Sequence, residues 1–234
     1  MDDKLVIVLG FYRGGKFIET LLKNNYKVIG IDASKETINY CKDKYKNYNN
    51  LTLINKCISD KDNSTVIFYL SDWDVWNSLN KDIANRLDKC IGEDIIETIT
   101  LPTLLNTYGC PFYLRMDIEG FDELALIQLL NTKYRPKYIS CESECLGNEY
   151  KNIYDKIDGL TNLNLLRDLG YTKFYLHKED NNLDDLDIFS KSIGWVSYDE
   201  VKNNIIQLRS EFCEDVRNDK SLYFGFWYDI YATN

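Results

Sequence analysis

Short apolar runs alternate with amphipathic stretches in the first quarter of the chain. A continuous apolar run predicts a buried strand, and apolar residues that recur every three or four positions predict a helix that covers it. Strands are predicted at residues 5–9, 27–31 and 51–58, with helices after the first two, and Ser34 can cap the second helix. This order predicts the start of a parallel, doubly wound α/β sheet with helices on both faces.

The alternation is interrupted at about residues 61–101. Two β-rich runs, at residues 65–70 and 95–101, flank a tryptophan-containing segment and a helical run at residues 83–89. This pattern predicts a β-rich excursion, a segment inserted between the third and fourth strands of the main sheet. Pro102 then suits the first turn of a short helix, where its missing N–H would have no partner.

The second half returns to alternating elements. Strands are predicted at residues 112–116, 138–141, 172–176 and 223–231, and helices at residues 121–130 and 160–169. The long segment at about residues 178–222 ends in a helix with a capping box and an apolar stripe, made of Ser197, Glu200, Val201, Ile205, Leu208 and Phe212. We expect one domain over residues 1–234 with this helical insertion.

Charge and composition exclude several classes of function. The 234 residues carry a net charge of −9, and an acidic surface repels phosphate backbones, so no nucleic-acid partner is expected. No apolar run approaches the roughly 20 residues that span a bilayer, and the first residues lack a signal-peptide pattern. The seven cysteines contain no Cys-x-x-Cys pair, which with a single histidine argues against structural zinc. We therefore expect a cytoplasmic protein with reduced cysteines and no membrane partner.

A glycine-containing loop follows the first predicted strand. Gly10 and Gly14 precede a helix whose N-terminus offers free N–H groups. Asp32 ends the second strand, where an acid can accept both hydroxyls of a ribose. Tyr at position 12 breaks the Gly-x-Gly-x-x-Gly fingerprint of dinucleotide-binding proteins. Together, the glycine-containing loop and Asp32 favour a nucleoside ligand. The alternative is an ordinary strand–helix turn with a solvent-facing Asp32.

Two carboxylates follow the strand predicted at residues 112–116. Asp117 and Glu119 stand at its end, and Gly120 permits a tight turn into the next helix. Ligands of open α/β sheets bind beyond the carboxyl ends of the strands, so this turn is a candidate catalytic centre. The alternative is an ordinary turn before a helix N-terminus, which favours acidic residues.

This acidic turn carries a resemblance to a known family. Residues 114–123 read Leu-Arg-Met-Asp-Ile-Glu-Gly-Phe-Asp-Glu and resemble the Lys-Ile-Asp-Val-Glu-Gly-like motif of the FkbM family of S-adenosylmethionine-dependent O-methyltransferases. Residues 55–60 are similar to the family's segment after the third strand, Glu142 to its strand-end glutamate, and residues 169–171 to its late Leu-Gly-Tyr. The resemblance covers residues 5–176.

The resemblance implies a Rossmann-like class I methyltransferase fold, with a seven-stranded, mostly parallel sheet and an antiparallel last strand. It implies S-adenosylmethionine as cofactor and a hydroxyl of a sugar, glycan or related small molecule as acceptor. The implied cofactor-binding residues are Gly10, Tyr12, Gly14, Asp32, Ala33, Ser59, Asp60 and Asp117. The implied catalytic residues are Asp117, Glu119 and Glu142, and the residues expected to bind the acceptor are Trp76, Asn77, Ser78, Glu144 and His177. The alternatives are that Trp76 closes the core and that His177 is a strand-end residue with no role.

Several alternatives stay open beside this interpretation. Glu119 could instead shape the turn by bonding backbone N–H groups. Clustered acids suit Mg²⁺, but no ligand spacing supports a metal and none is expected. The insertion at about residues 178–222 is expected to form a lid over the acceptor, with a peripheral helix or a dimer contact as the alternative. A homo-oligomer is left open.

The sequence also departs from the family. Val8 stands where the family usually has an acid, Phe11-Tyr12 replaces Ala-Asn, Leu101-Pro102 replaces Leu-Asp, and Arg115 replaces Lys. The missing acid motivates a second hypothesis, a binding or scaffold protein that kept the fold and lost catalysis. A nucleic-acid methyltransferase is disfavoured by the acidic charge and by the lack of an Asn/Asp-Pro-Pro-Tyr motif.

Overall fold

The computed structural model of the chain describes residues 2–85, 89–145, 160–178, 189, 193–218 and 226–234. The chain divides into two compact units, of which unit 1 is Met1–Ile139 and unit 2 is Ser140–Asn234. Unit 1 contains the first four strands of the main sheet together with the excursion. Unit 2 contains most of the fifth strand and the last two.

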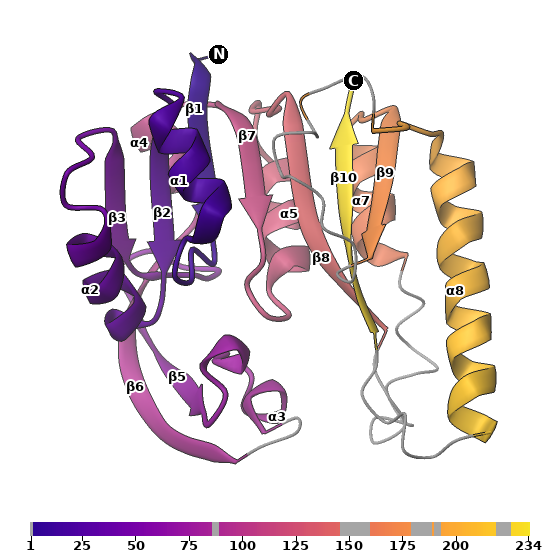
Figure 1. Cartoon of the computed structure of the whole chain (residues 1–234), viewed down its shortest axis with the longest axis horizontal. Coiled ribbons are helices and arrows are strands. Elements are labelled where there is room, and N and C mark those ends of the chain that lie inside the picture. Colours follow the sequence, from indigo (N-terminus) through magenta and orange to yellow (C-terminus); the bar gives the residue numbers. More distant parts are fainter. Residues whose placement is uncertain (1, 86–88, 146–159, 179–188, 190–192, 219–225) are drawn as a thin grey trace. The chain divides into compact units, whose positions relative to one another are not determined.

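Four neighbouring strands of unit 1 run parallel, in the order β3-β2-β1-β7. Their bounds are β1 (Asp2–Leu9), β2 (Lys27–Asp32), β3 (Leu51–Asn55) and β7 (Pro111–Met116). In Figure 1, α1 (Gly15–Lys23) and α2 (Lys35–Lys44) lie in front of these strands, and α4 (Leu101–Tyr108) and α5 (Asp122–Leu130) lie behind them. Helices on both faces explain why β1 and β2 are built from almost continuous apolar runs.

The helices turn their apolar faces towards this sheet. The buried side chains of α1 are Phe17, Ile18, Leu21 and Leu22. Burying one such side chain fully stabilises the fold by about 1.5–3 kcal/mol. The predicted cap of α2 is confirmed, because the Ser34 hydroxyl oxygen accepts a hydrogen bond of 3.1 Å from the Thr37 N–H.

The main sheet has seven strands in the order β3-β2-β1-β7-β8-β10-β9. The last three are β8 (Tyr138–Cys145), β9 (Lys173–Lys178) and β10 (Phe226–Thr233), and β10 runs antiparallel to β9. When only the strands of this sheet are counted along the chain, the order is 3-2-1-4-5-7-6. The predicted fold class is therefore confirmed as a seven-stranded, mostly parallel sheet of the class I methyltransferase type.

The excursion (residues 57–99) is a separate three-stranded sheet in the order β4-β6-β5. It contains β4 (Cys57–Ile58), β5 (Thr65–Ser71), the 3-10 helix η1 (Asp74–Trp76), α3 (Lys81–Ala84) and β6 (Cys90–Ile99). Figure 1 shows it beyond the ends of β2 and β3, on the side to which their arrowheads point. Its own small core packs around Cys57, Phe68 and Ile96.

Three predicted boundaries in this region are wrong. The strand predicted at residues 51–58 ends at Asn55, and the next two strand residues belong to β4. The strand predicted at residues 95–101 is β6, which spans Cys90–Ile99. The helical run predicted at residues 83–89 is α3, which ends at Ala84, and residues 86–88 lie outside the described part. For the two strands, pairing within the second sheet, which local sequence does not reveal, decides the boundary.

Both ends of the excursion are fastened to the main sheet's helices. The Gln128 side chain on α5 donates to the Ser59 carbonyl oxygen at 2.7 Å and accepts from the Leu101 N–H at 2.8 Å. Asp62 accepts from the N–H of Thr100 at 2.7 Å and from the Thr103 hydroxyl at 2.7 Å. These bonds fix where the chain leaves the main sheet and where it returns.

Unit 2 packs a long helix against its own strands. α8 (Tyr198–Asn218) begins at a hydrogen bond from the Glu200 N–H to the Ser197 hydroxyl oxygen, as predicted. Val201 and Ile205 are buried, Leu208 is half-buried, and the Phe212 side chain lies outside the described part. The Tyr198 ring lies edge-to-face with Phe174 of β9 and against Arg167 of α7 (Thr161–Asp168). The start of α8 is therefore part of unit 2's core, and the lid stays a prediction.

The strands of unit 2 also differ from their predicted ends. β8 continues to Cys145, so Glu142 and Glu144 lie within the strand rather than after it. β9 continues to Lys178, so His177 also lies within a strand. Among the described residues, no helix is both long and apolar enough to cross a membrane.

Candidate active site

The glycine loop (residues 10–15) and the acidic turn (residues 117–120) touch through their backbones. Gly10 has φ +76°, and a Cβ there would lie 1.7 Å from the Asp117 carbonyl oxygen. The Asp117 N–H donates to the Leu9 carbonyl oxygen at 3.0 Å. Position 10 must therefore be glycine because another part of the protein approaches it, whatever ligand the loop binds.

Gly14, the second glycine of the loop, is required by a different contact. Gly14 has φ +74°, and a Cβ there would lie 2.7 Å from the Tyr45 hydroxyl oxygen. That hydroxyl donates to the Gly15 carbonyl oxygen at 3.2 Å. Phe11 is buried, and its ring lies where a Cβ on Gly30 would be. The loop is thus fastened to β2 and to the end of α2.

Asp32 is a half-buried acid at the end of β2 that binds this loop. Its carboxylate accepts from the N–H groups of Tyr12 and Ser34, each at 2.8 Å. Burial raises the pKa of Asp32 to about 6; the N–H donors oppose this rise, and the charge of Asp117 adds to it. The Asn55 amide nitrogen donates to the carbonyl oxygens of Asp32 and Ala33, at 3.0 and 2.9 Å. The predicted residues Tyr12, Asp32, Ala33 and Asp117 therefore lie around one strand end.

The acidic turn is held by a buried carboxylate that sequence reasoning did not single out. Asp122 is 3% exposed, and its side chain accepts from the Ile118 N–H at 3.1 Å. Glu119 has φ +47°, a conformation that costs a non-glycine residue free energy and persists only where neighbours enforce it. Arg115 forms an ion pair of 3.3 Å with the carboxylate of Asp117. An acid in the first turn of the helix is the sequence signal for Asp122.

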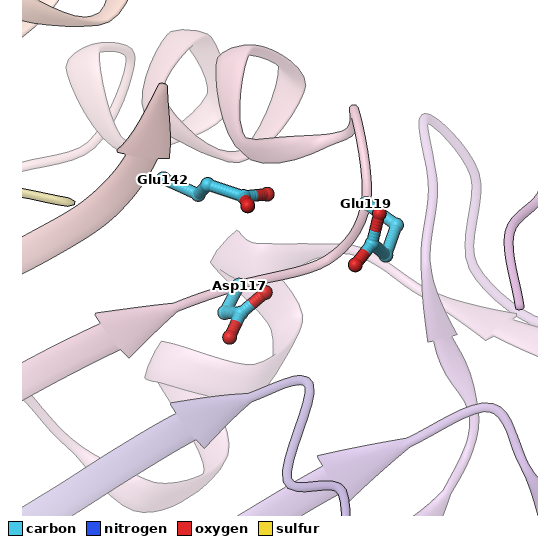
Figure 2. A group of neighbouring side chains, drawn as sticks. All are labelled: Asp117, Glu119 and Glu142. Carbon is cyan, nitrogen blue, oxygen red and sulfur yellow. The ribbon is translucent and has the colours of Figure 1, made fainter. Parts of the chain in front are cut away.

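Three acids with predicted catalytic roles are drawn in Figure 2. Asp117 and Glu119 belong to the acidic turn of unit 1, and Glu142 belongs to β8 in unit 2. Carboxylate oxygens are the ligands that Mg²⁺ prefers, but acids in this number also occur in proteins without any ion and do not by themselves argue for one.

The excursion supports the acidic turn from outside. The Ser78 hydroxyl is buried and donates to the Glu119 carbonyl oxygen at 3.0 Å. The Asn77 amide oxygen accepts from the Ser71 N–H at 2.7 Å and closes the local turn. Trp76 lies edge-to-face with Trp73, their ring centroids 5.0 Å apart. The polar atoms of Asn77 and Ser78 thus make structural bonds, and their predicted contact with an acceptor stays a prediction.

One contact to the glycine loop was missed by sequence reasoning. Asp74 of η1 forms an ion pair of 2.7 Å with Arg13 and accepts from the Tyr12 hydroxyl at 3.2 Å. These partners are 61 and 62 residues apart in the chain. No local pattern connects positions so distant, which is why neither Arg13 nor Asp74 could be singled out from the sequence.

The remaining predicted residues are described within their own units. Ser59 is buried at the start of the excursion, and Asp60 beside it is exposed. In unit 2, the Glu142 carbonyl oxygen accepts from the Asn162 side chain at 2.7 Å, and His177 pairs with Asp229 across β9 and β10. The side chain of Glu144 lies outside the described part.

Comparison with known proteins assigns a family model to most of this chain. The model described as the methyltransferase FkbM domain matches residues 12–173. None of the curated proteins compared with the sequence matches it significantly.

Solved structures give distant matches, among them three methyltransferases. A precorrin-6y C5,15-methyltransferase from Geobacter metallireducens is 10% identical, with a TM-score of 0.41 and coverage of 98% of this chain and 78% of its own. A SAM-dependent methyltransferase from Archaeoglobus fulgidus is 15% identical, with a TM-score of 0.42 and coverage of 99% and 86%. The methyltransferase domain of the bacterial CtHen1-CN is 13% identical, with a TM-score of 0.45 and coverage of 99% and 90%.

Proposed function

Because the chain belongs to the methyltransferase FkbM domain family, we propose that it is an S-adenosylmethionine-dependent O-methyltransferase. The proposed acceptor is a hydroxyl group of a sugar, a glycan or a related small molecule. The observation that carries the proposal is the position of Asp32, which binds the glycine loop through the Tyr12 N–H and whose pKa is raised by burial and, to a smaller extent, by the charge of Asp117.

The residues around Asp32 fit the nucleoside part of this cofactor. A carboxylate offers about four acceptor positions. Three N–H groups approach that of Asp32, those of Phe11, Tyr12 and Ser34, which leaves room for a ribose hydroxyl. Hydroxyl donors also favour the charged carboxylate over the neutral acid, so they would compensate its burial.

The acidic turn fits the acceptor side of the same reaction. When bound, the cofactor supplies a methyl group on a positively charged sulfur. The protein must then align an acceptor oxygen with that group and assist the loss of its proton. Asp117 is the proposed residue for this task, because its carboxylate is half-buried and Arg115 holds it in one orientation. A carboxylate is a sensible base for a sugar-like hydroxyl that lies within hydrogen-bond reach of it.

Calorimetric titration with S-adenosylmethionine tests the first part of the proposal. We expect binding in the micromolar range, as cofactor affinities commonly are. A titration with no heat change at about millimolar cofactor would reject the enzyme hypothesis, because weaker binding than that would not support catalysis. A tritium-transfer screen over nucleotide sugars and free glycans then tests the acceptor class. Binding without transfer to any hydroxyl would instead favour the alternative, a methyltransferase fold that binds but does not catalyse.

A further inference from the structure

Tyr12 is the strained residue of the glycine loop. Its φ is +45°, a left-handed conformation that is unfavourable for a residue with a large side chain. Its N–H nevertheless has to point at Asp32, to which it donates at 2.8 Å. Strained residues of this kind persist only where the surroundings hold them, so the contacts around Tyr12 determine the shape of the loop.

Helix α2 holds the loop from one side. The Cys41 thiol donates to the Tyr12 carbonyl oxygen at 3.2 Å, and the Lys44 ammonium donates to the Arg13 carbonyl oxygen at 3.1 Å. The ring of Tyr40 lies 5.7 Å from the guanidinium carbon of Arg13. These contacts all come from α2, one of the helices that cover the main sheet.

The excursion holds the loop from the other side, through one carboxylate. Asp74 binds both side chains that follow Phe11, the Arg13 guanidinium at 2.7 Å and the Tyr12 hydroxyl at 3.2 Å. Arg13 in turn stacks on the Tyr12 ring at 5.4 Å, so the three groups support one another. The two carboxylate oxygens are used separately, Oδ2 for Arg13 and Oδ1 for Tyr12, which fixes the orientation of both partners.

We propose that Asp74 is a positioning residue for the cofactor, which acts by holding Tyr12 and Arg13 so that the glycine loop is already in its binding conformation. This inference rests on the proposed function. Asp74 touches the loop rather than the ligand, and a loop that is ordered before binding loses less conformational entropy when the ligand arrives. The excursion thereby supports the glycine loop through Asp74 and the acidic turn through Ser78.

The test compares Asp74→Asn with the unmodified protein in calorimetric titrations with S-adenosylhomocysteine. This probe lacks the charge on sulfur, so salt acts mainly on the protein. Because the Arg13–Asp74 pair is half-exposed, we expect Asp74→Asn to raise Kd about fivefold at low salt. The difference should shrink between about 20 mM and about 500 mM NaCl, because salt screens an exposed ion pair. A residue that only supports the fold would leave Kd unchanged at both salt concentrations.

Asp72→Asn is the matched control, since it removes an equal charge from the same segment without touching Tyr12 or Arg13. Asp72→Asn should leave Kd unchanged. Tyr12→Phe removes only the hydroxyl that Asp74 accepts from, and should raise Kd about twofold. If Asp74→Asn does not fold, Tyr12→Phe still tests the contact between Asp74 and the loop.

Equal Kd values for the unmodified protein and Asp74→Asn at low salt would overturn the positioning role. A rise in Kd that Asp72→Asn shares, or a rise that is the same at low and high salt, would also overturn it. If the unmodified protein binds no probe at about millimolar concentration, the proposed function fails, and the role of Asp74 fails with it. The two failures are therefore distinguishable in one experiment.

Discussion

A Cβ atom on Gly10 would lie 1.7 Å from the carbonyl oxygen of Asp117. The two residues follow neighbouring strands, β1 and β7, whose ends run side by side. Real Cβ atoms do not come so close to backbone, so the glycine loop and the acidic turn can adopt this arrangement only with glycine at position 10. The loop expected to bind the cofactor and the turn expected to face the acceptor are thus fixed against each other.

Gly10→Ala is expected to cost more than about 4 kcal/mol of unfolding free energy, because both its φ of +76° and its neighbour exclude a side chain. Gly15→Ala is the matched control: its φ is +55°, but a Cβ there meets nothing within 4 Å. The control should cost only about 1–2 kcal/mol, from backbone strain alone. Urea unfolding measures both, and equal losses would mean that the Asp117 carbonyl can move aside.

The raised pKa of Asp32 predicts a pH-dependent stability. Its pKa is about 6 in the folded protein and 3.8 for an unperturbed aspartate, so the folded state holds the proton more strongly. This contribution is complete below about pH 4 and is lost as the pH rises through about 6, a change on the order of 2–3 kcal/mol. Urea unfolding of the unmodified protein and of Asp32→Asn, at several pH values between about 4 and 7.5, measures it.

The difference between these two proteins is the informative quantity, because all other titrating groups are shared. We expect the stability of the unmodified protein to fall relative to Asp32→Asn as the pH rises. A difference that is constant with pH would show that Asp32 titrates near its ordinary value. S-adenosylmethionine should also bind more tightly near pH 7 than near pH 5, because the ribose hydroxyls donate hydrogen bonds more strongly to the charged carboxylate of Asp32.

Asp117→Asn is expected to abolish methyl transfer with little loss of fold, once an acceptor is found. The amide keeps the size of the side chain but cannot take the acceptor's proton. Because Asp117 also forms an ion pair with Arg115, Arg115→Gln should be compared with it. Turnover and the thermal unfolding midpoint are the two measurements. Unchanged turnover in Asp117→Asn would remove this residue as base or acceptor ligand.

Two adjacent isoleucines test whether α8 is part of unit 2's core. Ile205 is 1% exposed and Ile206 is 47% exposed, although both lie on the same helix. Ile205→Ala should cost about 2–5 kcal/mol of stability, since it leaves a cavity, and Ile206→Ala less than about 0.5 kcal/mol. Urea unfolding distinguishes them. Similar, small losses would mean that α8 is only loosely docked, as a movable lid would be.

The sequence by itself determined the elements of the main sheet and much of the candidate site. Continuous apolar runs and helical periodicity are local properties, so β1, β2, α1 and the Ser34 cap could be predicted from neighbouring residues alone. Asp32 and Asp117 could be singled out because each ends a predicted strand, and parallel strands that end on one edge bring their last residues together.

Only the tertiary structure decided what depends on residues far apart in the chain. The break between β3 and β4 follows from pairing with β6, about 40 residues later, and not from any change in the apolar run. The pKa of Asp32 near 6 requires burial by surrounding segments, and the contact of Asp74 with Arg13 joins positions 61 residues apart. The need for glycine at position 10 likewise comes from the Asp117 carbonyl, since a loop's own sequence does not state what will pack against it.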